Sequence, residues 1–229
     1  MNKKILVVAA HPDDEVLGVG GALLRHTAEG DIVHIMILAE GITSRGAKRD
    51  VARDEEKLSN LQEASKKVAD FIGVERLIMR GFPDNRMDGE ELLNVVKQVE
   101  TEVDEFSPDT VYTHHAGDVN VDHQVAHKAV MTACRALPGA TAKQLLFFET
   151  LSSTEWQMPM YSNGFFPNWY VDIDEYIDKK LELLHFYESE MRKYPHPRSY
   201  EGVSILAKMR GMAAGLNAAE AFMLGRKVC

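Results

Sequence analysis

Short apolar runs alternate with segments of helical periodicity along the chain up to about residue 150. Continuous apolar runs at residues 5–10 and 32–39 predict two strands, the first of them covered on both faces. Further strands are predicted at residues 74–79, 110–113 and 145–149. Between them, apolar side chains recur at the spacing of one helix face, which predicts helices at residues 16–29, 54–72, 90–106 and 123–135. Strands that alternate with helices predict an α/β fold with a mostly parallel sheet, helices on both of its faces and right-handed crossovers.

Beyond residue 150 the pattern is less regular. The segment at residues 150–170 is rich in aromatic residues and proline, and helical periodicity returns at residues 175–187 and 200–224, on either side of a break at residues 194–197. No repeat, low-complexity tract or linker divides the sequence, and 229 residues are an ordinary length for one domain. We therefore predict a single domain over residues 1–229 that ends in C-terminal helices.

Composition narrows the possible partners and location. The 26 Lys and Arg residues against 35 Asp and Glu residues give a formal net charge of −9, and the cations are spread along the predicted helices, so we expect no nucleic-acid partner. The two cysteines, Cys134 and Cys229, form no disulfide framework and fit a reduced, cytoplasmic setting. No stretch approaches the ~20 apolar residues of a membrane span, and the apolar run at residues 5–10 is shorter than the ~7–15 residues of a secretory signal core.

Candidate metal ligands follow the first predicted strand. Ligands of an open parallel sheet bind beyond the carboxyl ends of its strands, and the sequence there is HPDDE at residues 11–15. The G-x-G-x-x-G fingerprint of a nicotinamide-dependent oxidoreductase is absent from this position. The glycines at residues 18–21 come a turn later, where they suit close packing of a helix on the sheet. His11 and Asp14 are three residues apart across a helix start, a spacing that suits a divalent metal and zinc in particular.

A second cluster of candidate ligands lies after another predicted strand. Residues 114–123 form the densest group of His and Asp in the rest of the chain, directly after the strand at residues 110–113. Since the carboxyl ends of parallel strands meet at one edge of a sheet, the two clusters together predict a shared metal site. The alternative for either cluster alone is a set of polar groups that cap a strand end. The residue types alone do not show which side chain of this second cluster would be the third metal ligand.

Two further segments are candidates for substrate contacts. The loop at residues 81–88 follows a predicted strand, and its Asp84, Asn85 and Arg86 either hydrogen-bond sugar hydroxyls or a phosphate, or simply form a turn. The aromatic segment at residues 156–170 either provides a surface on which a sugar stacks or packs in a subunit interface.

The sequence AHPDDE at residues 10–15 resembles the signature of the PIG-L/LmbE-like deacetylases. NVDH at residues 120–123 is similar to the second motif of that family, and AEAF at residues 219–222 is similar to its C-terminal part, so the resemblance covers almost the whole chain. The resemblance implies a Rossmann-like fold, a zinc ion (Zn2+) and removal of an N-acetyl group from an N-acetylglucosamine-type conjugate. Known members act on N-acetylglucosamine attached to inositol, malate or lipid-linked carriers, which implies a small-molecule amino-sugar conjugate as substrate. Members often form oligomers, so a homo-oligomer is compatible with the resemblance.

By the same resemblance, His11, Asp14 and His123 bind the zinc ion and Asp13 is the general base. Three protein ligands leave a zinc position open for water, whose pKa the metal lowers to ~7. Asp13 then accepts a proton from the water that attacks the amide carbonyl and passes it to the leaving amine. The alternative for Asp13 is a plain helix N-cap, a position that aspartate favours. Glu15 is expected to support the site structurally.

One position departs from the family. Many members carry a histidine three residues before the metal-binding histidine, whereas this chain has Asn120 there. Asparagine donates a hydrogen bond but transfers no proton, so either Asn120 serves only as an oxyanion donor or another residue, His115 or His196, supplies the proton. The alternatives are a polar strand-end group for His115 and a loop residue held between two prolines for His196. Asp122 is expected to orient a ligand histidine.

Other functions remain open on the residues alone. The same zinc-activated water would hydrolyse other small amides, and a noncatalytic protein that binds a metal or a sugar would keep the same ligands. Asp13 beside an open zinc position favours catalysis, and therefore a hydrolase of carbon–nitrogen bonds other than peptide bonds, over a binding protein.

Overall fold

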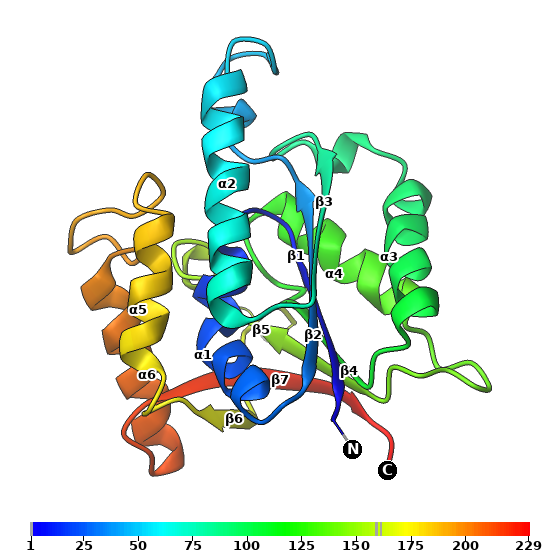
Figure 1. Ribbon diagram of the computed structural model, residues 1–229, viewed down its shortest axis with the longest axis vertical. Coiled ribbons are helices and arrows are strands. Elements are labelled where there is room, and N and C mark those ends of the chain that lie inside the picture. The colour runs from blue at the N-terminus through cyan, green and yellow to red at the C-terminus, as the bar shows by residue number, and fades with distance from the viewer. Residues whose placement is uncertain (1, 159, 161) are drawn as a thin grey trace.

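A sheet runs through the centre of the computed structural model, which describes residues 2–158, 160 and 162–229 (Figure 1). In these residues seven strands pair in the order β3-β2-β1-β4-β5-β7-β6. The parallel strands are β1 (Lys4–Ala9), β2 (Ile32–Ala39), β3 (Arg76–Phe82), β4 (Thr110–His114) and β5 (Gln144–Phe148). The antiparallel strands β7 (Ala219–Lys227) and β6 (Trp169–Asp172) extend the sheet beyond β5.

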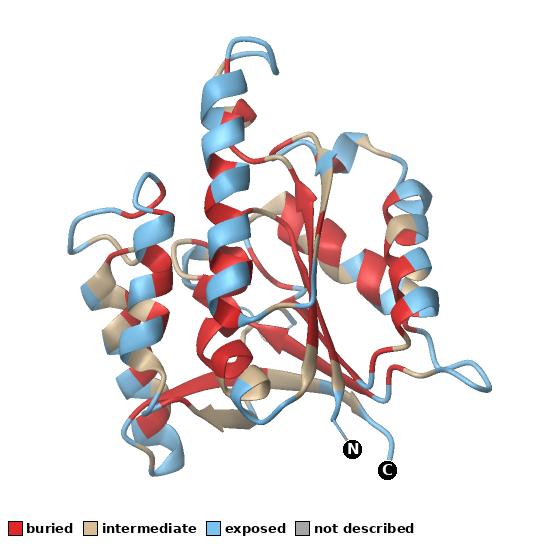
Figure 2. Ribbon diagram, in the orientation of Figure 1, coloured by how far each residue is buried: buried red, intermediate tan, exposed pale blue. Residues whose placement is uncertain are grey.

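Helices cover both faces of this sheet (Figure 1). One face carries α3 (Leu92–Phe106) and α4 (Val121–Ala133), and the other carries α1 (Asp14–Ala28), α2 (Glu55–Ile72), α5 (Ile177–Phe186) and α6 (Tyr200–Ala214). Successive side chains of β1 point to opposite faces, so Ile5 and Leu6 belong to two different cores, and both are fully buried. Figure 2 shows that most of the central sheet has the colour of buried residues. A strand buried on both faces is apolar throughout. The predicted α/β, Rossmann-like fold, with a mostly parallel sheet and helices on both faces, is confirmed.

The C-terminal segment differs from the prediction. The expected helix at residues 200–224 ends at Ala214, where Gly215 takes a left-handed φ of 74° and closes α6. The rest of that segment belongs to β7, which pairs with β5 so that Phe222 lies opposite Phe148. Pairing with the open edge of β5 outweighs the helical spacing of the alanines there, because strand preference depends on the available partner. The other predicted helices and strands occur with ends moved by a few residues.

Close packing of α1 on the sheet sets the position of the loop that precedes it. A Cβ atom on Gly18 would lie 2.3 Å from the Phe148 ring, and one on Gly21 would lie 2.8 Å from Ile173. Only glycine permits these approaches, so the predicted packing role is confirmed for Gly18 and Gly21 but not for Gly20, whose nearest neighbour is Val16 of the same helix. The first turn of α1 is thereby held at the carboxyl end of β1.

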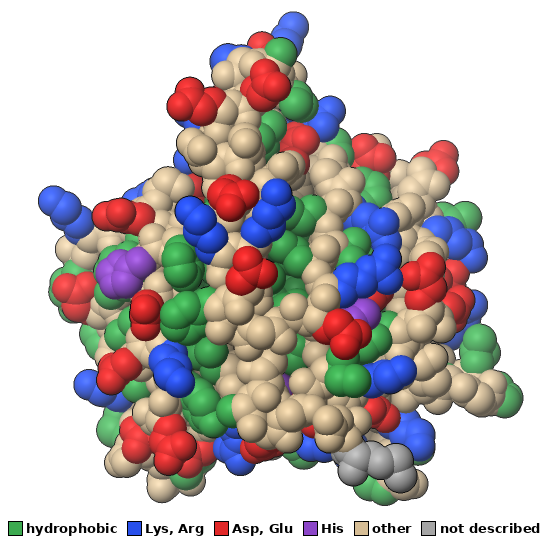
Figure 3. Space-filling view, viewed as in Figure 1, with side chains coloured by type: hydrophobic (Ala, Val, Ile, Leu, Met, Phe, Trp, Pro, Cys, Tyr) green, Lys and Arg blue, Asp and Glu red, His purple; other side chains and the backbone are tan. Residues whose placement is uncertain are grey.

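The surface charges and the apolar character of the helices are relevant to two expectations, that the protein has no nucleic-acid partner and no membrane span. Figure 3 shows one face of the molecule, where Lys and Arg side chains are interspersed with Asp and Glu side chains and form no continuous basic area. Among the residues that the structure describes, no helix combines the length and the apolar character needed to cross a membrane. The single-domain organisation stays a prediction.

Candidate active site

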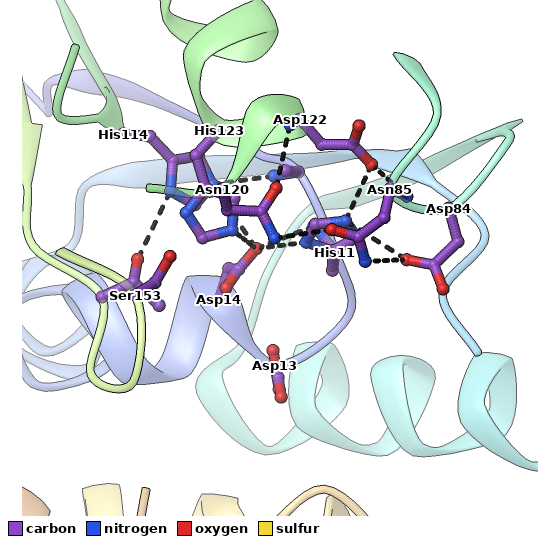
Figure 4. A network of polar contacts seen from close by, with 12 residues as sticks. His11, Asp13, Asp14, Asp84, Asn85, His114, Asn120, Asp122, His123 and Ser153 are labelled. Atoms are coloured by element: carbon purple, nitrogen blue, oxygen red, sulfur yellow. Dashed lines mark hydrogen bonds and ion pairs between the residues drawn. The ribbon is translucent and has the colours of Figure 1, made fainter. Parts of the chain in front are cut away.

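Three side chains from two strand ends converge at the carboxyl edge of the sheet (Figure 4). His11 follows β1, Asp14 begins α1, and His123 lies in the first turn of α4, after β4. Asp14 Oδ2 lies 3.1 Å from His11 Nδ1 and 3.2 Å from His123 Nε2. Ligand atoms of all three residues fall within 4.8 Å of one another. The structure thus brings together the three residues that the sequence predicts as metal ligands.

These separations fit ligands of a single zinc ion. With zinc–ligand bonds of ~2.0–2.1 Å, neighbouring ligand atoms of a tetrahedral site lie ~3.3 Å apart, close to the two distances measured around Asp14. Two imidazoles and one carboxylate are also a donor set that zinc enzymes use, with the fourth position left for water. The residues present therefore fit the metal that the family resemblance implies.

In His11 and His123, the outer nitrogen is the ring nitrogen that does not face Asp14. Each outer nitrogen faces another carboxylate. His11 Nε2 lies 3.0 Å from Asp122 Oδ2, while His123 Nδ1 lies 3.2 Å from Asp118 Oδ2 at an angle outside hydrogen-bond geometry. A carboxylate at the outer nitrogen holds the ring proton there and leaves the inner nitrogen free to bind a metal. Asp122 lies where the sequence predicts an orienting carboxylate. Asp118 was not singled out, although it belongs to the second His/Asp cluster.

Both orienting carboxylates are held by several donors. Asp122 accepts hydrogen bonds from the backbone N–H groups of Asn85 (2.6 Å) and Met87 (2.9 Å), which tie the loop after β3 to the site. Asp118 accepts hydrogen bonds from the hydroxyl groups of Ser153 and Thr154. Several hydrogen bonds hold each of these carboxylates in one position, so the two carboxylates fix the orientation of the two rings.

The charges around the candidate ligands favour protonated histidines, and a cation would displace those protons. Burial lowers the pKa of His123, but Asp14 and Asp118 outweigh burial and raise that pKa to about 9. Burial likewise disfavours the charged form of His11, yet Asp122 and Asp14 raise its pKa well above the ordinary value. The pKa of Asp14 lies well below its ordinary value in spite of burial, because the neighbouring histidines favour the carboxylate. Metal binding at such a site releases protons.

His114 is a further histidine of the second cluster near this centre, and both of its nitrogens are engaged. Nε2 accepts a hydrogen bond from the N–H of Ala10 (2.9 Å), and Nδ1 lies 3.3 Å from Thr150 Oγ1. Burial lowers the pKa of His114 well below its ordinary value, so the ring is neutral. It stacks on His123 with the ring centroids 3.8 Å apart and supports that ring.

Asp13 occupies the N-cap position of α1 but does not act as a cap. Its side chain makes no capping hydrogen bond with the first turn of α1, all of which the structure describes. Instead Oδ2 accepts a hydrogen bond from Arg198 Nη1 at 2.8 Å. Burial raises the pKa of Asp13 to about 7, although Arg198 lowers it in part. A carboxylate with a pKa near neutrality is suited to accept and return a proton.

A cavity of about 290 Å³ opens beside these residues. The predicted site residues in its lining are His11, Asp13, Asp84, Asn85, Asn120, His123 and His196. Asp14 lies behind them with 1% of its surface exposed. Trp156 also lines the cavity and meets His196 edge to face, with the ring centroids 5.5 Å apart. Most of the predicted residues therefore share one space.

His115 and Arg86 are not among the lining residues in the described part of the chain. His115 is buried, and its Nε2 lies 2.9 Å from the carbonyl oxygen of Asn163. Arg86 is exposed on the loop after β3. The structure therefore does not bring these two side chains to the metal ligands, and their catalytic and substrate roles stay predictions.

Arg198 is the contact of Asp13 that the sequence did not reveal. It follows the Pro-His-Pro break, and its backbone N–H donates to His196 Nδ1 at 3.1 Å while Nε donates to Ser152 Oγ at 3.0 Å. Two prolines around His196 indicate a rigid loop, but nothing local places that loop over the end of β1. Glu190 and Arg192, from the same part of the chain, also line the cavity.

The fold and the site define a Rossmann-like α/β protein with a candidate metal-binding cavity at the carboxyl edge of its sheet. The family model described as PIG-L: GlcNAc-PI de-N-acetylase matches residues 6–134, which include both His/Asp motifs. The chain therefore belongs to the PIG-L family, and the resemblance seen in the sequence is confirmed.

One relative is similar in sequence along most of its length, and one solved structure shares the fold. A protein of Escherichia coli K12 described as the uncharacterized deacetylase YaiS is 28% identical over 193 residues, which are 82% of this chain and 91% of YaiS. The solved N,N'-diacetylchitobiose deacetylase of Pyrococcus horikoshii superposes with a TM-score of 0.77 at 18% identity, covering 98% of this chain and 84% of that one.

One solved structure shows that this fold serves more than deacetylation. GalB of Pseudomonas putida KT2440, a 4-carboxy-2-hydroxymuconate hydratase, superposes with a TM-score of 0.75 at 21% identity, covering 99% of this chain and 98% of GalB. Likeness at this identity shows the fold alone. The activity of the present chain therefore depends on its own side chains.

Proposed function

We propose that this protein is a zinc-dependent hydrolase that removes the N-acetyl group from an N-acetylglucosamine-type conjugate. The observation that carries the proposal is the convergence of His11, Asp14 and His123 within 4.8 Å, with the buried Asp13 beside them in one cavity. The family description, GlcNAc-PI de-N-acetylase, supports both the deacetylation and the sugar. Zinc held by these three ligands would supply an acidified water and polarise the amide carbonyl.

Asp13 is the group that moves protons in the proposed reaction. Its carboxylate accepts one proton from water as the water oxygen attacks the acetyl carbon, and it returns that proton to the amide nitrogen as the C–N bond breaks. The products are acetate and a free amine. Arg198, 2.8 Å from Asp13 Oδ2, keeps the carboxylate in one orientation during both transfers.

Asn120 and His196 are the proposed donors to the developing oxyanion and to the substrate. Asn120 Oδ1 accepts the N–H of Asp122 as the cap of α4, so its amide group faces the cavity. One N–H of that amide donates to Asn85 Oδ1 at 2.9 Å, and the second remains for the substrate. His196 Nδ1 accepts the N–H of Arg198, which leaves the proton on Nε2 as a donor.

The cavity wall suits an amino sugar. Among the residues that line the cavity, Asp84 and Asn85 offer polar atoms for hydroxyl groups, and the indole of Trp156, 55% exposed, offers an apolar surface for a pyranose ring. We infer that these groups hold the sugar while its acetamido group lies at the metal ligands. A cytoplasmic location and assembly into a homo-oligomer stay predictions.

A deacetylation screen tests the proposal. Purified protein with zinc is incubated with N-acetylglucosamine conjugates, and free amine and acetate are measured, with chelator-treated protein and zinc add-back as controls. We expect release of both products in equal amounts, lost with chelator and restored by zinc. Turnover of other acetylated amines but of no acetylated sugar would leave the other amide hydrolase as the function. Zinc retention without any amide cleavage, or hydration of a muconate-type substrate instead, would overturn the proposal.

A further inference from the structure

We propose that Glu15 is a positioning residue that holds the backbone of Asp13, and that Tyr187 holds Glu15 in place for this purpose. The inference rests on the proposed function, in which Asp13 is the general base. Arg198 fixes the carboxylate of Asp13 from the cavity side, whereas Glu15 and Tyr187 act on its main chain from the protein interior.

The backbone of Asp13 has a conformation that needs support. Its φ of 106° and ψ of −29° lie in the left-handed half of conformational space, which residues with a Cβ atom rarely adopt. The N–H of Asp13 donates to Glu15 Oε2 at 3.0 Å. This hydrogen bond spans two residues and closes the turn that leads from β1 into α1. Without it, a buried N–H group would lack an acceptor and the turn would relax toward ordinary backbone angles.

Glu15 is itself held by distant helices. Its second carboxylate oxygen, Oε1, accepts a hydrogen bond from the hydroxyl of Tyr187 at 2.6 Å. Tyr187 ends α5 and is completely buried, and its oxygen also lies 3.0 Å from Ser65 Oγ on α2. Because a phenol has one proton to give, the shorter contact with the carboxylate takes it. The chain of contacts therefore runs from α2 and α5 through Glu15 to the main chain of Asp13.

Burial of a carboxyl group at position 15 costs folding free energy. Glu15 is 1% exposed and forms no ion pair with a Lys or Arg in the part of the chain that the structure describes. Burial raises the pKa of Glu15 to about 8, so taking this carboxyl group out of water opposes folding unless its oxygens are hydrogen-bonded. An apolar residue would fill the same space at a lower cost in free energy. It would, however, form neither of the two hydrogen bonds of Glu15.

Loss of this support should displace Asp13 and leave metal binding largely unchanged. The ligand Asp14 is held separately, because its Oδ2 accepts the backbone N–H of His11 at 2.9 Å. A shift of about 1 Å in a catalytic group lowers turnover by up to about 100-fold. The expected signature is therefore a lower kcat with unchanged KM and unchanged zinc content.

Substitution of Glu15 tests the inference. In Glu15→Ala we expect kcat to fall about 10- to 100-fold, with KM and bound zinc as in the wild type and faster hydrogen exchange of the Asp13 amide. Glu15→Gln should stay within a few-fold of the wild type, since its amide oxygen accepts the Asp13 N–H and its NH2 group can donate to the Tyr187 oxygen. Glu63→Ala, at an exposed glutamate of α2, is the matched control.

Tyr187→Phe gives a second, milder test that keeps the carboxylate. We expect a several-fold lower kcat, with KM and zinc content unchanged. Tyr200→Phe is its control, because the buried Tyr200 hydroxyl has no hydrogen-bond partner among the described residues. If Glu15→Ala does not fold, Tyr187→Phe decides the matter.

Several results would overturn the inference. These are wild-type kcat and wild-type exchange of the Asp13 amide in Glu15→Ala, unchanged kcat in Tyr187→Phe, or loss of zinc in Glu15→Ala and Glu15→Gln alike. If the wild-type protein releases no acetate at all, the proposed function fails. In that case exchange of the Asp13 amide still reports whether Glu15 holds this backbone.

Discussion

Arg198 donates a hydrogen bond to Asp13 from 185 residues further along the chain, with 2.8 Å between Nη1 and Oδ2. The contact joins the loop between α5 and α6 to the loop between β1 and α1. It places a cation against the carboxylate that the proposed reaction uses as a base, inside the cavity that also contains His11 and His123. The charges of Arg198 and of the metal ligands therefore both act on the carboxyl group of Asp13.

Removal of the Asp13 carboxylate tests its role as a base. Asp13→Asn keeps the size of the side chain and leaves the three metal ligands in place, so we expect normal zinc content. Turnover should fall about 100- to 10,000-fold, the usual contribution of general acid–base catalysis. Acetate release and metal analysis on the same sample check both points, with Asp70→Asn, at an exposed position of α2, as the control. Near-normal turnover would remove Asp13 from the mechanism.

Removal of the Arg198 charge should shift the pH dependence of the reaction. Burial raises the pKa of Asp13 and Arg198 lowers it, so Arg198→Gln should raise that pKa further. A larger fraction of Asp13 is then protonated at a given pH, and the acidic limb of the kcat/KM profile moves to higher pH. Arg210→Gln, which removes a similar ion pair with Glu149 elsewhere, is the control. An acidic limb that stays in place or moves to lower pH contradicts this role.

The carboxylate behind His123 should tune metal affinity. Asp118→Asn removes the charge 3.2 Å from His123 Nδ1 but keeps a side chain of the same size. Partners of this kind contribute about 10- to 100-fold to metal affinity, so we expect the Kd for zinc to rise by that factor. Competition with a chromophoric chelator measures it. His123→Ala should lose more affinity than Asp118→Asn, and an exposed-site variant, Asp88→Asn, should bind as the wild type does.

Zinc should stabilise the folded protein. A ligand at a free concentration about 100 times its Kd stabilises the native state by about 2.7 kcal/mol, which for a chain of this length raises Tm by roughly 5–10 °C. Thermal unfolding with chelator and with added zinc measures the difference. His123→Ala should show little or no shift. Equal Tm values for the wild type with and without zinc would argue against a site formed by the folded chain.

The two thiols should differ in reactivity. Burial raises the pKa of Cys134 to about 12, although Arg226 lowers it in part, whereas Cys229 is exposed. The reactive species is the thiolate, so at pH 8 a thiol reagent should modify Cys229 rapidly and Cys134 only after unfolding. Titration with and without denaturant counts them, and Cys229→Ser should remove the rapid phase. Two rapidly reacting thiols in the native protein would show that Cys134 is accessible.

The sequence by itself determined the α/β architecture and the metal-ligand candidates. Continuous apolar runs indicate burial on both faces, and that property belongs to the strand itself, so β1 and β2 could be recognised from local pattern. The two His/Asp clusters each follow a predicted strand, and parallel strands bring their carboxyl ends to one edge wherever they lie in the chain. The two clusters could therefore be assigned to one place, and the family resemblance then selected His123 within the second cluster.

Only the tertiary structure decided β7 and the surroundings of Asp13. β7 is a strand because the open edge of β5 is there to pair with it, which the alanine-rich sequence does not reveal. Arg198 and Tyr187 reach Asp13 and Glu15 across 185 and 172 positions of sequence, through the packing of α5 against α1 and α2. Such contacts depend on how separate elements pack, and no local periodicity or spacing records them.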